Sequence, residues 1–167
     1  ALYSAFCAQA PSPLPELSLQ YADFAHWQRQ WLQGDVLQTQ LNYWQQQLAA
    51  APPLLELPTN RPRPSTQTYR GRSEFLQLDR DLTQKLKHLS QESGTTLFMT
   101  LLTAFKLLLS RYSGKEDIVV GSAIANRNHR EIEPLIGFFV NTLALRTNLQ
   151  GNPTFLELIE RVKQVTL

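Results

Sequence analysis

Residues 136–146 read Ile-Gly-Phe-Phe-Val-Asn-Thr-Leu-Ala-Leu-Arg and are the most informative stretch of this chain. An apolar run up to Val140 leads into apolar and polar residues that alternate as far as Leu149. Alternation with a period of two is typical of a β-strand with one buried face. Asn141 and Thr142 interrupt the apolar run, although asparagine is depleted in strands.

The polar break at Asn141 needs a physical explanation. A carboxamide that is buried without hydrogen bonds costs about 1 to 3 kcal/mol, so we expect this side chain to have a binding partner. One explanation is a site that recognises a ligand. The alternative is local, either a β-bulge or a hydrogen bond from the side chain to the backbone where the strand starts. The residue pattern leaves both explanations open.

Further helices and strands are predicted on both sides of this stretch. The continuous apolar run 118–124 predicts a central strand covered on both faces, and residues 72–78 a shorter strand. Capping residues predict three helices: one after Asp79 that Gly94 closes, a deeply buried one from Thr96 to Ser113-Gly114, and one after Asn152 with Pro153 at its first position. This order predicts an α/β sandwich with helices packed on a sheet.

The first third of the chain is predicted to be helical. Aromatic residues recur at helical spacing over 21–31 and leucines over 37–48, which indicates two helices or one broken helix ending before Pro52-Pro53. Pro58, Pro62 and Pro64 then indicate an extended segment to about Thr68, with Arg61 and Arg63 in solvent.

Composition restricts the classes of function. The chain is 43% hydrophobic with a net charge of +2, it lacks a basic stripe, and we expect neither nucleic acid nor a membrane as partner. A single cysteine, Cys7, excludes an internal disulfide and favours a cytoplasmic setting. The three histidines lack zinc-ligand spacing, and no phosphate loop or nucleophile elbow occurs, so we expect no metal and no hydrolase. A first residue other than Met and a last residue inside an amphipathic run predict a piece of a larger protein.

Residues 136–146 closely resemble the fifth core motif of the condensation domains of nonribosomal peptide synthetases. Residues 21–28, Tyr-Ala-Asp-Phe-Ala-His-Trp-Gln, resemble the fourth motif of that family. The two lie in the family's order, and Tyr69-x-Gly71, Tyr112-Ser113-Gly114 and the segment 117–121 are also similar. The resemblance therefore covers nearly the whole chain.

The resemblance implies a chloramphenicol-acetyltransferase-like sandwich of two lobes, of which this chain holds an incomplete part. Residues 1–56 would be the helical C-terminal part of the first lobe, 57–68 a Pro-rich crossing segment, and 69–167 the N-terminal part of the second lobe. The catalytic His-His-x-x-x-Asp-Gly motif is expected upstream of Ala1, and the sixth and seventh motifs after Leu167. The resemblance thus implies no catalytic residue here, and we expect the chain alone to be inactive.

The implied reaction is acyl transfer that forms an amide bond between substrates bound as thioesters to peptidyl carrier proteins, a donor and an acceptor. Their phosphopantetheine arms enter the channel between the lobes from opposite faces, so this segment itself binds no cofactor. An adenylation domain is expected next to it in the parent chain. The product would be a secondary metabolite.

The resemblance also implies roles for individual residues. Asn141 and Thr142, with Gly137 and Phe139, are expected to line the substrate channel. Asn141 would donate a hydrogen bond near the reacting groups or the pantetheine arm, which the backbone at Gly137 can approach closely.

Five residues outside that stretch also receive roles. Arg127 either pairs with the Asp of the upstream motif or faces water. Tyr21 and Asp23 are expected to fix their helix against its lobe, and Trp27, like Trp31, to belong to the core.

Other functions stay open at this point. Epimerisation, heterocyclisation and acyl transfer to a hydroxyl occur on the same fold, and heterocyclisation domains carry an Asp-rich version of the upstream motif. A domain that docks a carrier protein without chemistry is a different class of alternative.

Overall fold

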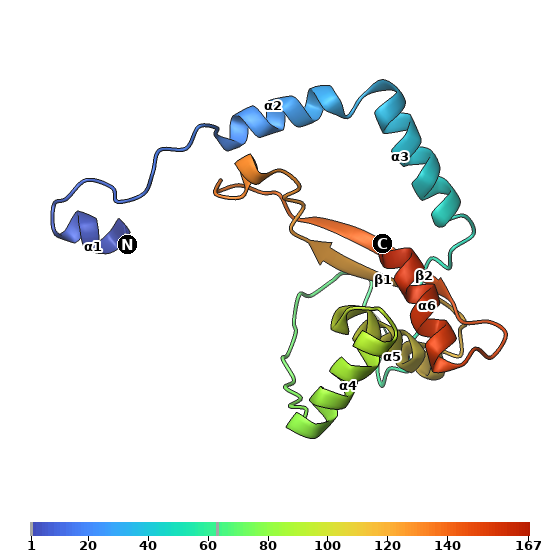
Figure 1. Ribbon diagram of the computed structural model, residues 1–167. Helices are drawn as coiled ribbons and strands as arrows, with labels where there is room; N and C mark the ends of the chain where they lie inside the picture. The colour runs from blue at the N-terminus through green and yellow to red at the C-terminus, as the bar shows by residue number, and fades with distance from the viewer. Residues whose placement is uncertain (1, 63) are drawn as a thin grey trace. The chain divides into compact units, whose positions relative to one another are not determined.

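The computed structural model describes residues 2–62 and 64–167 (Figure 1). Arg63, which we predicted to lie in solvent, is outside the described residues, as is Ala1. In chain order the elements are α1 (Leu2–Cys7), α2 (Tyr21–Trp31), α3 (Gly34–Gln47), α4 (Arg80–Glu92), α5 (Leu97–Ser113), β1 (Asp117–Ile124), η1 (Arg130–Ile132, a 3₁₀ helix), β2 (Asn141–Asn148) and α6 (Phe155–Thr166).

The chain divides into two compact units, each of which is built from two separate segments. The first unit holds Ala1–Gln46 with Ala123–Leu143, and the second holds Gln47–Ser122 with Ala144–Leu167. Both strands are cut by this division, because β1 and β2 each contribute residues to both units. The segment 51–79 between α3 and α4 contains neither helix nor strand in its described residues.

Two of the three predicted helix starts are confirmed. The Asp79 carboxylate accepts a hydrogen bond from the Leu82 backbone N–H at 2.7 Å, and the Thr96 hydroxyl accepts one from Met99 at 3.3 Å. Each bond satisfies a donor that the first turn of a helix leaves free. Gly114 ends α5 with a φ of +66°, a conformation that glycine adopts at little cost.

The predicted start of the last helix is wrong. The N-cap of α6 is Thr154, not Asn152, and Pro153 precedes the helix. The Thr154 hydroxyl accepts from the backbone N–H of Glu157 at 3.3 Å, while the Glu157 carboxylate accepts from the backbone N–H of Thr154 at 2.7 Å. This reciprocal pair, a capping box, satisfies two backbone donors.

β1 and β2 pair in a two-stranded sheet and run in opposite directions (Figure 1). The strands were predicted at these positions, but the prediction that β1 is a central strand is wrong, since each strand here has one neighbour. No strand forms at 72–78 either, where Phe75 is 97% exposed. A strand needs hydrogen bonds from a neighbouring strand, and this segment has none among the described residues.

The second unit has its core where α5 and α6 pack against the sheet. Ile118, Leu149 and Leu158 are buried together, and half-buried leucines at 55, 107 and 109 pack around them. The prediction that α5 is deeply buried all round is wrong. One of its faces is buried and holds Met99, Thr100, Leu102, Thr103 and Lys106, while Phe98, Leu101, Phe105, Leu108 and Tyr112 are exposed.

The first unit has a smaller core of four side chains. Phe24 comes from α2, Ile132 from η1, and Leu135 and Phe139 from the segment that leads into β2. In that segment Ile136 and Phe138 are exposed by 92% and 80%, so only some of its apolar residues face inward.

Among the described residues, no single helix is long and apolar enough to cross a membrane. Only α4 and α5 taken together meet a criterion of length and composition, and they are bent by 104° at the break between them.

Candidate functional site

The first unit brings residues of the two motif segments 21–28 and 136–146 into direct contact at Tyr21. This first residue of α2 donates a hydrogen bond from its hydroxyl to the Phe138 carbonyl at 3.0 Å. Its ring packs edge-on against the Phe139 ring, with 5.3 Å between centroids. The two segments are 117 residues apart at this hydrogen bond, so only the folded chain joins them.

Gly137 lies directly against the Tyr21 ring. A Cβ atom built on Gly137 would stand 2.7 Å from the ring carbon Cγ and 2.9 Å from Cε2, distances that real Cβ atoms do not show. The missing side chain therefore makes room for the tyrosine. The expected close approach of a substrate or pantetheine arm to the Gly137 backbone stays a prediction.

Phe139 is buried, with 4% of its surface exposed, and belongs to the core of the first unit. The guanidinium of Arg127 lies over its ring at 4.0 Å from the centroid, within the range of a cation–π interaction. Arg127 also donates to the backbone carbonyls of Ile132 and Glu133. The predicted ion pair of Arg127 stays a prediction, because its expected partner is not among these residues.

Asn141 and Thr142 are both exposed at the start of β2. The Asn141 side chain is therefore not buried. The Asn141 Oδ1 accepts a hydrogen bond from the backbone N–H of Thr142 at 2.8 Å, which is the local interaction that the sequence left open as an alternative. That these residues line a channel stays a prediction.

On α2, Asp23 and Trp27 occupy different surroundings. The Asp23 carboxylate accepts from the backbone N–H of Gln20 at 2.8 Å, at the start of the helix. Trp27 stacks on Trp31 with 5.6 Å between centroids and meets the His129 ring edge-on at 5.4 Å. The prediction that both tryptophans belong to the core is wrong, because they are 41% and 46% exposed.

Trp27 and His129 also line a hollow of about 340 Å³ in the first unit. Its other walls come from Leu19, Asp23, Phe24, Glu131 and Ile132. The aromatic spacing of α2 correctly indicated a helix, but it did not show which side of that helix the core would cover.

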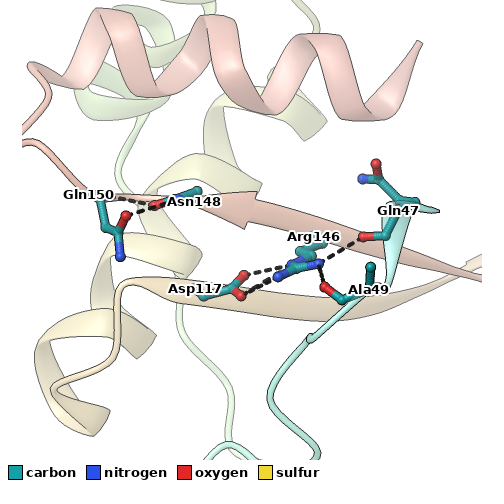
Figure 2. Close-up of polar contacts among 6 residues, drawn as sticks. All are labelled: Gln47, Ala49, Asp117, Arg146, Asn148 and Gln150. Carbon is teal, nitrogen blue, oxygen red and sulfur yellow. Dashed lines mark hydrogen bonds and ion pairs between the residues drawn. The ribbon is translucent and has the colours of Figure 1, made fainter. Parts of the chain in front are cut away.

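The second unit holds a polar cluster around Arg146, the last residue of the motif segment 136–146 (Figure 2). Its guanidinium donates from Nε and Nη2 to the Asp117 carboxylate, at 2.9 Å and 2.7 Å, and from Nη1 to the carbonyls of Gln47 and Ala49, at 3.0 Å and 2.7 Å. The hydrogen bond with Asp117 raises the pKa of Arg146. Neither residue was predicted to have a role, although Arg146 ends the motif segment 136–146 and Asp117 begins the similar segment 117–121.

Lys106 is a second polar residue of this unit that the sequence analysis missed. Its ammonium group is fully buried between α5 and β2, where it donates to the Leu145 carbonyl at 2.9 Å and to the Thr147 hydroxyl at 2.6 Å. Burial lowers its pKa to about 8. The signal in the sequence is a single lysine within the apolar run from Leu101 to Leu109.

The structure thus groups the predicted site residues in an unexpected way. Contacts link Gly137 to Tyr21, Tyr21 to Phe139 and Phe139 to Arg127, whereas Asn141 and Thr142 lie in solvent. Over residues 2–62 and 64–167, no group of three or more His, Cys, Asp or Glu side chains could hold a metal ion.

Comparisons with known proteins agree with the motif assignment. The family model of the condensation domain matches residues 1–167. The chain is 57% identical over 164 residues to a component of the linear gramicidin synthase of Brevibacillus parabrevis and 54% identical over 166 residues to malpinin synthetase of Mortierella alpina. These matches cover 98% and 99% of this chain but only 3% and 2% of those proteins.

A solved structure has the same fold. The X-domain from teicoplanin biosynthesis superposes with a TM-score of 0.89 at 29% identity, over 98% of this chain and 38% of that one, and it has also been solved as a complex with OxyB. With its motifs, its full-length family match and these relatives, the chain belongs to the condensation-domain family of nonribosomal peptide synthetases.

Proposed function

We propose that this chain supplies one wall of the substrate channel of a condensation domain that forms amide bonds between carrier-bound thioesters. The observation that carries this proposal is the family match over residues 1–167 together with 57% identity to a peptide synthase. The chain spans only 3% of that relative, so the reaction is proposed for the whole protein that contains it.

The proposed reaction joins two tethered substrates. The amine of the acceptor attacks the thioester carbonyl of the donor, a C–N bond forms, the C–S bond breaks, and the donor carrier keeps the free thiol. Holding amine and carbonyl together supplies much of the rate, because it removes the entropy cost of their encounter. A base must take the proton from the amine. We assign this role to the family's His-His-x-x-x-Asp-Gly motif, which does not occur in residues 1–167.

Asn141 is the residue of this chain that we propose to face the substrates. Its carboxamide is exposed, and the bond from the Thr142 N–H to Oδ1 fixes how the group is turned. Within the described part of the chain, its Nδ2 donates no hydrogen bond, so both N–H groups are available to a carbonyl of the thioester or of a pantetheine arm. A donor fixed in place in this way stabilises developing negative charge better than solvent does.

The test is Asn141→Ala in the full-length protein, with dipeptide formation measured on loaded carrier proteins. We expect the rate at saturating carriers to fall about tenfold or more, because a positioned donor is lost. The thermal midpoint should stay unchanged, because the side chain is exposed. Asn60→Ala, at an exposed asparagine of the 51–79 segment, is the matched control. Unchanged turnover of Asn141→Ala would leave this residue with its local backbone bond alone.

The wider setting belongs to the same proposal. The domain would have two chloramphenicol-acetyltransferase-like lobes, with residues 1–56 in the first, 57–68 crossing between them, and 69–167 in the second. Donor and acceptor peptidyl carrier proteins would present their phosphopantetheine arms as parts of the substrates, and an adenylation domain would adjoin. We keep the cytoplasmic location as a prediction.

A second candidate function is docking without chemistry. The observation that favours it is the structural likeness to the X-domain, which has been solved with another protein, OxyB, bound. The parent sequence ahead of Ala1 separates the candidates: an intact second histidine of the expected motif supports condensation, its loss supports docking, and an Asp-rich version supports heterocyclisation.

A further inference from the structure

We infer that Tyr21 is a positioning residue that fixes the position of Asn141. Gly137 leaves free the space that the Tyr21 ring occupies. This inference rests on the proposed role of Asn141 in the channel. Tyr21, Gly137, Phe138, Phe139 and Asn141 all belong to the first unit.

The first support is the fit between Tyr21 and Gly137. The ring occupies the space that any side chain at position 137 would need, as the distance of 2.7 Å from a Cβ to Cγ shows. No positive φ is recorded at this glycine, in contrast to Gly114 or Gly151. The requirement for glycine is therefore steric and comes from a residue far away in the sequence.

The second support is the hydrogen bond to the backbone. The Tyr21 hydroxyl donates to the Phe138 carbonyl at 3.0 Å, three residues before Asn141. Phe138 itself is 80% exposed, so its own side chain contributes little to holding this segment. One residue further on, the buried Phe139 ring meets the same tyrosine edge-on.

These contacts act on the short segment that carries Asn141. A backbone carbonyl bonded at 138 and a buried ring at 139 leave only Val140 before the asparagine, and Val140 is 52% exposed. A change at Tyr21 should thus move the Asn141 carboxamide, although the tyrosine itself need not touch substrate. A displacement of about 1 Å at a reacting site is enough to slow a reaction substantially.

The experiment is a pair of double-mutant cycles in the full-length protein. The first cycle combines Gly137→Ala with Tyr21→Ala and follows thermal denaturation of the domain. Gly137→Ala should lower the midpoint when the tyrosine is present and add no further fall when the ring is gone, because the clash then disappears. Gly71→Ala, at a glycine with open space around it, is the control. Additive effects of the two changes would overturn the inference.

The second cycle combines Tyr21→Phe with Asn141→Ala and follows dipeptide formation at saturating carriers. Tyr21→Phe keeps the ring and removes only the hydroxyl, so we expect a rate about three- to tenfold lower, corresponding to one hydrogen bond. In the Asn141→Ala background the same change should cost less than about twofold, because neighbouring effects are not additive. Tyr43→Phe, at an exposed tyrosine of α3, is the control.

The outcomes separate this inference from the proposed function. Two results would overturn the positioning role of Tyr21 and leave the channel role of Asn141 standing. One is that Tyr21→Phe lowers the rate equally in the wild-type and Asn141→Ala backgrounds. The other is that Tyr21→Phe leaves the rate unchanged while Asn141→Ala lowers it. Full activity of Asn141→Ala would overturn that channel role instead. The first double-mutant cycle would still show whether the Tyr21 ring requires a glycine at position 137.

Discussion

The contacts around Tyr21 in the first unit and those around Arg146 in the second are stabilised by different kinds of interaction. Tyr21, Phe24 and Phe139 pack through aromatic rings with one hydrogen bond from the tyrosine. Arg146 instead donates hydrogen bonds to a carboxylate and two backbone carbonyls. Aromatic packing depends on shape and excluded water, whereas a guanidinium depends on the number and direction of its acceptors.

The motif segment 136–146 contributes to both of these regions. Its first part, with Gly137 and Phe139, belongs to the first unit, and its last residue, Arg146, belongs to the second. Phe139, which we expected to line the channel, is buried in the core of the first unit, and Gly137 lies against the ring of Tyr21. Arg146, to which we gave no role, donates hydrogen bonds to Asp117 and to two backbone carbonyls of the second unit. A recognisable motif can therefore contain residues that build the fold, such as Phe139, beside residues such as Asn141 for which we propose a role in the channel.

Phe139→Ala should have the largest effect on stability, because it removes a ring from the core of the first unit. Truncating a buried phenylalanine leaves a cavity, so we expect the free energy of unfolding to fall by about 3 to 5 kcal/mol. Phe138→Ala, one residue earlier and 80% exposed, is the matched control and should change it by less than about 0.5 kcal/mol. Chemical denaturation of the full-length protein measures both. Similar stability of the two variants would return Phe139 to the channel wall.

Arg146→Lys tests whether the polar cluster of the second unit depends on hydrogen-bond geometry or on charge alone. Lysine keeps the charge but loses the planar fork that serves Asp117 and two carbonyls at once, so the thermal midpoint should fall by several degrees. Arg72→Lys, at an exposed arginine, should leave it unchanged. Calorimetry distinguishes the two results; equal midpoints would mean that charge alone, and not hydrogen-bond geometry, holds this cluster.

Burial of Lys106 should make the stability of the protein depend on pH. Burial lowers its pKa from 10.5 to about 8, so between these values the unfolded state binds more protons than the folded state. Stability should therefore rise with pH from about 8 to 10.5, by at most about 1.4 kcal/mol per pH unit. Lys106→Met should lose this rise, and Lys87→Met, at an exposed lysine of α4, should keep it. Denaturation at pH 7 and pH 9.5 measures the slope; a wild-type protein without it would mean that the ammonium group is hydrated.

Most of the local structure was predictable from the residues. Asp79, Thr96 and Gly114 stop and start helices through bonds to their own backbone neighbours, and such short-range signals are visible in a sequence. The start of α6 can also be recognised in the sequence, because Thr154 and Glu157 have the spacing of a capping box. We placed the N-cap two residues too early, at Asn152, because Pro153 is typical of a first helical position.

Burial was predicted less well than secondary structure. The apolar residues of α5 recur on more than one face, which indicated a helix surrounded by protein, yet Phe105 and Tyr112 are exposed and Lys106 is not. The prediction of a strand at 72–78 was wrong for a related reason, since a strand is stable only when a neighbouring strand supplies its hydrogen bonds. Which surfaces meet depends on parts of the chain that are distant in sequence.

The order of the residues is enough to assign the family, the two motif segments, most of the helices and the positions of β1 and β2, because these follow from local capping, periodicity and motif residues. Only the tertiary structure decided that the ring of Tyr21 requires a glycine at 137, that Phe139 is core, and that the Asn141 carboxamide is exposed and tied to its own backbone. The physical reason is that steric fit and burial arise from contacts such as the one between Tyr21 and Phe138, which join residues that have no neighbours in common along the chain.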